Sequence, residues 1–406
     1  MTTSLTPVNG IRLGTANARI RRSVGVPQKD REDLVLMEIV DGANTSAVFT
    51  RNAFCAAPVQ LARGHLDAVN PRFLLINVGN ANAGTGEKGL LDAKACCDVV
   101  AGYAHCSPEA VLPFSTGVIG EPLPVDRIRE GVVQAARNLS PDGWERAARA
   151  IMTTDLVPKG VSRCIETPDG RFTITGIAKG SGMIRPDMAT MLAFVATDAA
   201  VAPDILRQTL TYAVDRSFHR ITVDGDTSTN DACVLVATGV ADVPTFDHVG
   251  GDAYDLFRQG VTDVCEALAK SIIQDAEGAN KFITVDVRGG KSEEECAQVA
   301  FSIAHSPLVK TAFFAEDPNW GRILAAVGRA GLSDFDIARV RIFMDDVCIV
   351  ASGARAEEYT EAAGQRVMKA PEITVRVELG RGAENAVVWT SDFSYEYVRI
   401  NAEYRT

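Results

Sequence analysis

In this 406-residue chain, one threonine lies where cleavage of the preceding peptide bond would turn it into a catalytic N-terminal residue. Thr190 lies between a Gly- and Pro-punctuated stretch, residues 179–186, and a short apolar run, residues 191–196. The first pattern is typical of a loop and the second of a buried strand. A threonine hydroxyl is a poor nucleophile without a base, but an N-terminal threonine carries one, its own α-amine of reference pKa about 8. Cleavage of the Ala189–Thr190 bond would therefore create nucleophile and base together.

Position alone favours a simpler role for Thr190, because β-branched residues are common where strands begin. The same holds for the other polar residues that could do chemistry nearby. Thr116 and Gly117 could simply form a turn, and Thr153 or Thr154 could cap a helix end. Lys179 could be a solvated surface side chain, and Glu277 could lie at the end of a helix. Residue types and spacing thus leave a catalytic and a structural interpretation open.

Several long blocks of sequence, in the right order, resemble the ornithine acetyltransferases, also called bifunctional glutamate N-acetyltransferases of arginine biosynthesis (the ArgJ family). Besides residues 179–198, the matching blocks are residues 115–120, 221–231, 316–322 and 401–406. The resemblance runs from about residue 115 to the end, and the N-terminal third matches less closely. Small departures occur at Ala276, where the family usually has Gly, and at Asn280, where it usually has Thr.

The resemblance implies self-cleavage between Ala189 and Thr190, giving an α chain, residues 1–189, and a β chain, residues 190–406, that fold as one unit. Thr190 would be the nucleophile. The remaining implied site residues are an oxyanion hole of Thr116 and Gly117, and substrate contacts from Thr153, Lys179, Glu277, Asn401 and Thr406. Thr154 is an open alternative to Thr153, because the two are adjacent.

The implied reaction moves the acetyl group of N-acetyl-L-ornithine to Thr190 and then to L-glutamate. It needs no metal or cofactor, and acetyl-CoA is an open second donor. The family usually assembles as an α2β2 heterotetramer. The alternatives are an N-terminal-nucleophile aminopeptidase of the same fold, which would pass its acyl group to water, and a non-enzymatic binding protein in which Thr190 is an ordinary strand residue.

Composition excludes several other classes of protein. The net charge of −11 argues against a nucleic-acid partner. No apolar run approaches the roughly 20 residues that span a bilayer, and the first residues lack a secretory signal pattern, so a cytoplasmic protein is expected. The nine cysteines contain no Cys-x-x-Cys pair, and they and the five histidines lack zinc-ligand spacing. Residues 224–235 depart from a calcium loop at its sixth and twelfth positions.

The fold implied by the resemblance is α/β and ArgJ/DmpA-like, with two packed β-sheets flanked by helices. Local patterns predict a β-meander over residues 7–60 and short strands with one helix over residues 332–390. An alternating strand over residues 171–179 delivers the chain to the cut site. The small-residue loop 79–84 fits either a tight turn or a pocket wall. Asn230 and Asp231 are expected in a hydrogen-bonded loop that supports the site.

Overall fold

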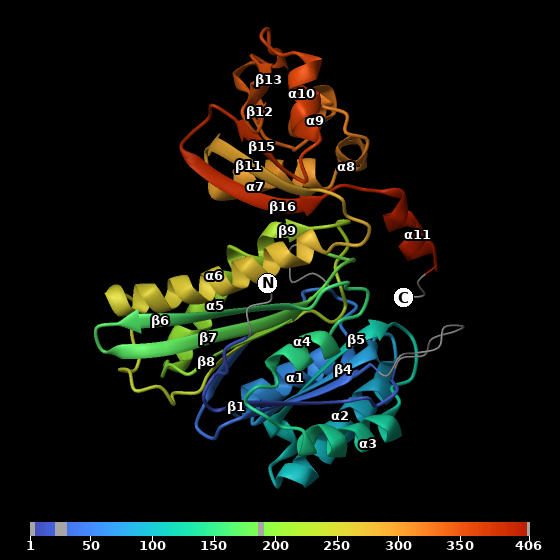
Figure 1. The fold of residues 1–406 in the computed structure, drawn as a ribbon, viewed down its shortest axis with the longest axis vertical. Coiled ribbons are helices and arrows are strands. Elements are labelled where there is room, and N and C mark those ends of the chain that lie inside the picture. The colour runs from blue at the N-terminus through green and yellow to red at the C-terminus, as the bar shows by residue number, and fades with distance from the viewer. Residues whose placement is uncertain (1–4, 21–30, 186–190, 404–406) are drawn as a thin grey trace.

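Two β-sheets face each other at the centre of the molecule, in a computed structural model that describes residues 5–20, 31–185 and 191–403 (Figure 1). The first sheet has the strand order β1 (Ile11–Ala16), β2 (Leu34–Ile39), β4 (Phe73–Asn80), β5 (Val111–Val118). The second has the order β3 (Asn44–Phe49), β10 (Ala232–Ala237), β8 (Leu192–Thr197), β7 (Gly170–Lys179), β6 (Lys159–Thr167).

Apolar side chains from both sheets form the layer between them. Met37, Ile76 and Phe114 of the first sheet belong to one buried cluster with Phe194 and Val234 of the second. The rings of Phe114 and Phe194 meet edge to face, with centroids 5.2 Å apart. All six residues of β8 are buried, because this central strand is covered on both faces, as continuous apolar runs require.

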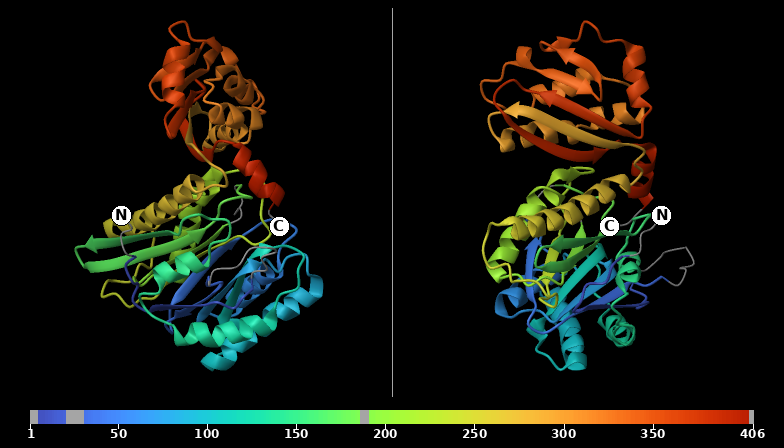
Figure 2. Two further views of the ribbon diagram at one scale, coloured as in Figure 1. Left: turned by 45° about the vertical axis from the view of Figure 1, so that its right-hand side comes forward. Right: turned by 60° about the vertical axis from the view of Figure 1, so that its left-hand side comes forward.

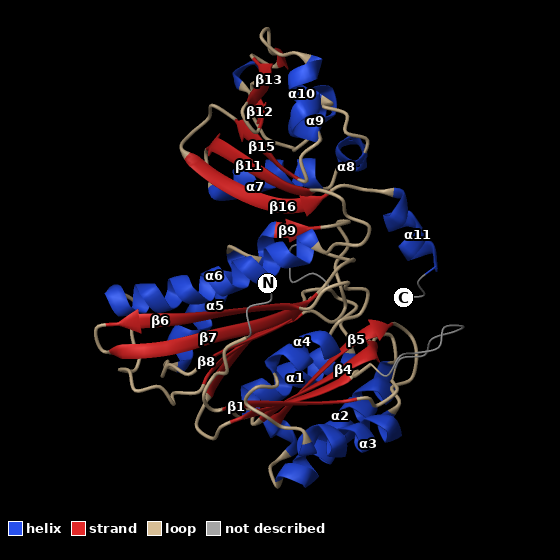
Figure 3. Ribbon diagram, in the orientation of Figure 1, coloured by secondary structure: helices blue, strands red, loops and turns tan. Residues whose placement is uncertain are grey.

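Helices cover the outer face of each sheet (Figure 3). Over the first sheet lie α2 (Gly86–Ala104) and α3 (Val125–Arg137), whose buried residues share a core with β1, β2 and β4. Over the second lie α5 (Pro203–Asp215) and α6 (Asp252–Gln274). Shorter helices, α1 (Ala57–Ala68) and α4 (Trp144–Ala150), add Ala62 and Trp144 to the central core. The prediction of two packed sheets flanked by helices is confirmed.

A second lobe, visible at the top of both views of Figure 2, follows the sandwich. Its seven-stranded sheet has its own core. The strand order is β14 (Ala354–Arg355), β13 (Val347–Ala351), β12 (Arg341–Met344), β15 (Glu372–Glu378), β11 (Phe282–Gly290), β16 (Glu384–Ser391), β9 (Ile221–Thr222). The helices of the lobe are α7 (Glu293–Ala304), α8 (Pro307–Phe314), α9 (Trp320–Gly328) and α10 (Glu361–Met368). The sequence patterns predicted strands here but not a separate lobe.

The predicted β-meander over residues 7–60 is wrong in two respects. β1 and β2 pair as antiparallel neighbours, but β3 leaves them and pairs with β10 in the opposite sheet. Residues 57–68 form helix α1, which begins with Pro58 in its first turn. Pairing with a strand 190 residues away depends on the assembled sandwich and is invisible to local patterns.

Two features of this architecture position the site. β7 and β8 are antiparallel neighbours, so the segment between them returns to the same end of the second sheet. From the second lobe, α11 (Tyr395–Glu403) runs back towards that end of the sandwich (Figure 1). None of the helices in the described parts of the chain is long and apolar enough to cross a membrane.

Candidate active site

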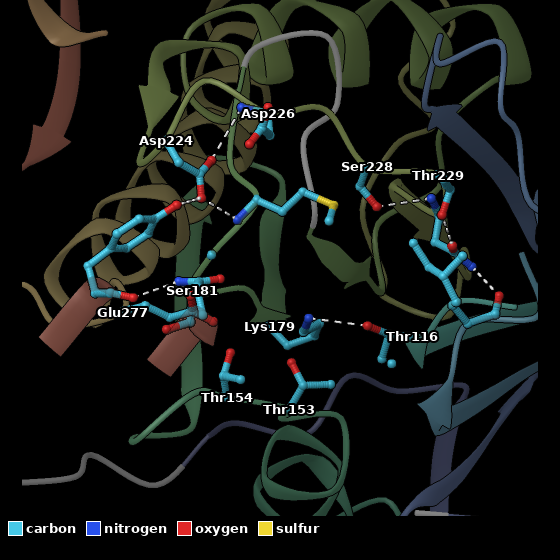
Figure 4. Close-up of a pocket in the computed structure, with 18 residues that line it drawn as sticks. Thr116, Thr153, Thr154, Lys179, Ser181, Asp224, Asp226, Ser228, Thr229 and Glu277 are labelled. Carbon is cyan, nitrogen blue, oxygen red and sulfur yellow. Dashed lines mark hydrogen bonds between the residues drawn. The ribbon is translucent and has the colours of Figure 1, made fainter. Parts of the chain in front are cut away.

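A pocket of about 260 Å³ opens where loops from both sheets meet α11. Figure 4 draws the residues that line it. Among the residues around it are seven that the sequence singled out: Thr116, Gly117, Thr153, Thr154, Lys179, Glu277 and Asn401. The other three, Ala189, Thr190 and Thr406, lie outside the described residues. The predicted polar residues, which span nearly 290 positions of sequence, are thus gathered around one cavity.

Strand pairing brings Lys179 to the predicted cut site. Lys179 precedes Thr190 by eleven residues, yet it ends β7 directly opposite Leu192 at the start of β8. Directly opposed residues of antiparallel strands have Cα atoms about 5 Å apart. Covalent connectivity places Thr190 two residues before Leu192. The pairing therefore places Lys179 beside the strand that directly follows the predicted cut site.

Lys179 is buried and charged groups surround it. It is 2% exposed, and its Nζ donates a hydrogen bond to Thr116 Oγ1 at 3.2 Å. Burial lowers its pKa, while the carboxylates of Asp155, Asp231 and Glu277 oppose that change. Such a lysine can hold a substrate carboxylate by its charge, and it can lower the pKa of a neighbouring ammonium group.

Thr116 and Gly117 lie near the end of β5, at the pocket. Gly117 has φ +133°, and a Cβ there would lie 2.3 Å from the carbonyl carbon of Gly79 on the paired strand β4. Only glycine allows this close approach. Thr116 and Gly117 both line the cavity, as oxyanion donors must.

Gly117→Ala is expected to destabilise the protein by more than about 2 kcal/mol, because the new methyl group would overlap backbone in a positive-φ conformation. The free energy of unfolding, measured by denaturant titration, checks this. Gly120→Ala is the matched control: it also has positive φ, +82°, but open space around its Cβ, so about 1 kcal/mol is expected. Equal losses in the two variants would contradict the steric explanation.

The start of β8 is held by Asp231. This residue is 1% exposed, and its Oδ1 accepts a hydrogen bond from the Met191 N–H at 3.0 Å. That nitrogen belongs to the peptide bond that joins Thr190 to Met191. Next to it, Asn230 donates from Nδ2 to the carbonyl oxygens of Ala81 at 2.7 Å and Ser115 at 3.0 Å. The expected supporting role of these residues thus has a structural basis: Asn230 joins the two sheets, and Asp231 holds the residue that precedes β8.

Asp224 is a pocket residue that sequence reasoning passed over after rejecting a calcium loop. Its carboxylate accepts hydrogen bonds from the Met183 N–H at 2.7 Å and the Ile184 N–H at 2.9 Å. It also accepts one from the Tyr397 hydroxyl of α11 at 3.1 Å. Burial raises the pKa of Asp224, and the hydrogen bonds from the Met183 N–H and the Tyr397 hydroxyl oppose that rise. Asp224 thus ties the segment before the cut site to the C-terminal helix.

Glu277 closes the pocket opposite Thr116. Its Oε2 accepts a hydrogen bond from Asn401 Nδ2 at 2.8 Å, so a residue of α11 reaches the site across 124 positions of sequence. A Cβ on Gly182 would lie 2.3 Å from that same oxygen. The carboxylate therefore projects over backbone that carries no side chain.

Two open alternatives of the sequence can now be compared with the geometry. Thr153 and Thr154 both line the pocket, so either can contact a ligand there. Ala81, within the small-residue loop 79–84, also lines it, which favours the pocket-wall interpretation of that loop. Within the described residues, no group of histidine, cysteine, aspartate and glutamate side chains is arranged to hold a metal ion.

Comparison with known proteins gives one family over nearly the whole chain. A sequence model of the ArgJ family matches residues 15–406. The chain is similar to the arginine biosynthesis bifunctional proteins ArgJ of Methylococcus capsulatus, 58% identical over 99% of this chain and 97% of that one, and Pseudomonas syringae pv. tomato, 52% identical over 99% and 98%.

A solved structure of the arginine biosynthesis bifunctional protein ArgJ from Bacillus halodurans is also similar. It is 36% identical with a TM-score of 0.50, and the match covers 52% of this chain and 98% of the solved one. The resemblance found in the sequence is confirmed: this chain belongs to the ArgJ family.

Proposed function

We propose that this protein is a bifunctional enzyme of arginine biosynthesis that transfers the acetyl group of N-acetyl-L-ornithine to L-glutamate through an acetyl ester on Thr190. The observation that carries this proposal is the pocket itself. A buried lysine, a candidate oxyanion hole and a carboxylate gather beside the start of β8. The relatives of 52–58% identity carry the name of a bifunctional protein of arginine biosynthesis.

Self-cleavage is the first step. The Thr190 hydroxyl attacks the carbonyl carbon of Ala189, and the peptide bond is exchanged for an ester. Water hydrolyses the ester, leaving a carboxylate on Ala189 and a free amine on Thr190. The Bacillus halodurans ArgJ supports this step, because a match over 98% of that polypeptide spans only 52% of this chain. The solved polypeptide is thus about half as long, as a cut near the middle would leave it.

Acyl transfer follows by double displacement. The α-amine of Thr190 takes the hydroxyl proton, and the oxygen attacks the acetyl carbon while Thr116 and Gly117 stabilise the oxyanion. The amide bond breaks, ornithine leaves with the proton, and the acetyl group remains on Thr190. The neutral amine of glutamate then attacks this ester. The bond between the acetyl carbon and the Thr190 oxygen breaks, a proton of the amine passes to that oxygen, and N-acetylglutamate leaves. In this scheme Lys179 holds the substrate carboxylate and Glu277 the ornithine ammonium, with Thr153, Asn401 and Thr406 completing the pocket.

Glu277→Gln is expected to raise the KM for N-acetylornithine by about 10- to 100-fold, because it removes a charged partner of the ornithine ammonium. The KM for glutamate, which has no such group, is expected to change less. Steady-state kinetics with each substrate varied in turn provide the measurement. Glu266→Gln, in an exposed ion pair with Lys270 on α6, is the control and should leave both values unchanged. Equal effects on the two substrates would refute the assigned role.

An exchange assay tests the proposed function. Purified protein is incubated with N-acetylornithine and either glutamate or water alone, and ornithine and N-acetylglutamate are quantified. The proposal predicts N-acetylglutamate in step with ornithine. Ornithine release without glutamate at the same rate would favour the aminopeptidase-like alternative, and no turnover would refute the proposal. Replacing N-acetylornithine by acetyl-CoA tests the second half of the bifunctional activity.

The proposal includes the setting of the enzyme. An α2β2 assembly is proposed from the family resemblance. A cytoplasmic location is supported by the nine cysteines, all of which are free thiols, as is usual in a reducing compartment. Neither a metal nor a resident cofactor has a role in the proposed chemistry.

A further inference from the structure

Four buried charged side chains of alternating sign form a row that begins at the pocket lining with Lys179 and continues behind it. Lys179, Asp155, Lys159 and Asp275 come from the end of β7, the loop before β6, the first residue of β6 and the end of α6. Their exposed fractions are 2%, 5%, 2% and 8%. Charges are rarely buried without partners, because each loses its hydration. Only Lys179 among them was recognised from the sequence as a site residue.

Lys159 joins the two carboxylates. Its Nζ lies 2.7 Å from Asp155 Oδ1 and 2.6 Å from Asp275 Oδ2, and all three side chains are at most 6% exposed. Distances this short are typical of charge-assisted hydrogen bonds. The lysine therefore fixes the loop before β6 against the end of α6, 120 residues later in the sequence.

Asp155 ties two walls of the pocket together. One carboxylate oxygen, Oδ2, accepts a hydrogen bond from the Thr153 N–H at 2.9 Å. The other, Oδ1, accepts one from the Gly180 N–H at 2.8 Å. Thr153 is the candidate substrate contact, and Gly180 follows Lys179 directly. The carboxylate of Asp155 thereby sets the distance between the backbone at Thr153 and the backbone that follows Lys179.

Asp275 extends the same connection to Glu277. Its Oδ2 also accepts hydrogen bonds from the N–H groups of Leu156 at 3.0 Å and Val157 at 3.3 Å. Its backbone carbonyl accepts one from Ser181 Oγ at 2.7 Å, and the Glu277 N–H donates to the Ser181 carbonyl at 3.0 Å. The threonine loop, the segment after β7 and the Glu277 turn are thus held by one connected set of bonds.

The row also determines the charges around Lys179. The charged groups that act on its ammonium are Asp155, Lys159, Asp231 and Glu277. After burial, which lowers the pKa of Lys179, the carboxylate of Asp155 is the largest influence and raises it. Burial opposes ionisation of Asp155 in turn, but Lys179, Lys159 and the Gly180 N–H outweigh it and lower the pKa of that carboxyl group.

We propose that Asp155, Lys159 and Asp275 are positioning residues of the acetyl-transfer site, which hold Thr153, Lys179 and Glu277 at the spacing of an amino-acid substrate. Of the three, Asp155 also favours the charged form of Lys179. The inference rests on the proposed function. None of the three side chains lines the pocket, so they act through Thr153, Lys179 and Glu277 and not on the substrate itself.

Asp155→Asn is the informative variant, because it removes the charge facing Lys179 while keeping the size of the side chain. Less of Lys179 is then an ammonium group at any given pH. We expect the alkaline limb of kcat/KM for N-acetylornithine to move down by about one pH unit. The KM for N-acetylornithine at neutral pH is expected to rise by about tenfold or more, with a smaller change in kcat. The reason is that Thr153 and Lys179 would no longer be held at the right distance for substrate binding.

Two further variants separate these effects from general damage. Asp198→Asn makes the same change at a 3% exposed aspartate beyond the opposite end of β8, where the carboxylate accepts hydrogen bonds from the Thr173 N–H and from Asn9. It should leave the pH profile unchanged. Asp275→Asn weakens the contact between Asp275 and Lys159 but removes no charge that acts on Lys179. It should raise the KM for N-acetylornithine and leave the alkaline limb of the kcat/KM profile in place.

The experiment is the pH dependence of acetyl exchange by the four proteins, each shown by circular dichroism to be folded. A wild-type pH profile and KM in Asp155→Asn would overturn the inference, as would an equal shift in Asp198→Asn. If Asp155→Asn does not fold, an unchanged KM in Asp275→Asn would overturn it. Absence of acetyl transfer by the wild-type protein would instead refute the proposed function.

Discussion

Replacement of Thr190 by alanine is expected to leave one uncut polypeptide of 43.4 kDa with no measurable acetyl transfer. The hydroxyl is needed twice, first to attack the Ala189 carbonyl and then to carry the acetyl group. Loss of a catalytic nucleophile lowers kcat by about 10⁴-fold or more. A denaturing gel and the exchange assay measure both effects, and the wild-type protein should give two bands, each about half the mass.

Thr190→Ser is the matched variant, because it keeps the hydroxyl and loses only a methyl group. It should still be cut and should retain part of its exchange activity. The account would fail if Thr190→Ala were still divided into two chains and still turned over substrate. It would also fail if Thr190→Ser were as inactive as the alanine variant while folded and cut.

Thr116→Val is expected to lower kcat by about 10²- to 10³-fold with little change in KM. Its hydroxyl would stabilise the oxyanion, which exists only in the transition state and the tetrahedral intermediate. The substitution also removes the acceptor of the Lys179 hydrogen bond. Steady-state kinetics on the fully cut protein provide the measurement, so that a change in self-cleavage is not mistaken for one in turnover.

Thr116→Ser keeps the oxygen atom and serves as the control. Its kcat should remain within about tenfold of the wild-type value, because the hydroxyl donor is retained. A fall in the valine variant that appeared only in KM would show that Thr116 binds the substrate in its ground state. In that case the backbone N–H groups, and not this hydroxyl, would form the oxyanion hole.

Local sequence patterns predict the strands of this protein better than their pairing. The strand predicted over residues 171–179 is β7, and the apolar run at residues 191–196 is β8 with its bounds shifted by one residue. The pairing of β3 with β10, and of β9 at residues 221–222 with β16, joins segments far apart in the chain. Such contacts depend on the assembled core, which a local pattern does not encode.

The second lobe illustrates the same limit. Residues 332–390 show short strands and one helix, as the sequence predicts, but their partner β11 lies before them and β9 comes from the sandwich. The sheet order requires a parallel pairing of β11 with β15 across intervening helices. No residue pattern within 332–390 specifies that separate core.

Site residues that lie in family-like sequence motifs could be predicted from the sequence. The residues that hold them in position could not. Thr116, Lys179 and Asn401 stand in stretches that resemble the family and meet at the pocket. Lys159 and Asp275 stand outside such chemistry-bearing patterns, and their ion pair spans 116 positions of sequence. Asp155 carried a faint signal, because it directly follows the Thr153–Thr154 pair. Its partners emerge only in the folded chain.

The most direct test of the central claim is mass spectrometry of the purified, active protein before and after brief incubation with N-acetylornithine. The account predicts two polypeptides, one of which begins with Thr190 and gains the mass of one acetyl group on that residue. An intact 406-residue chain in fully active material, or an acetyl group carried by another residue, would contradict it.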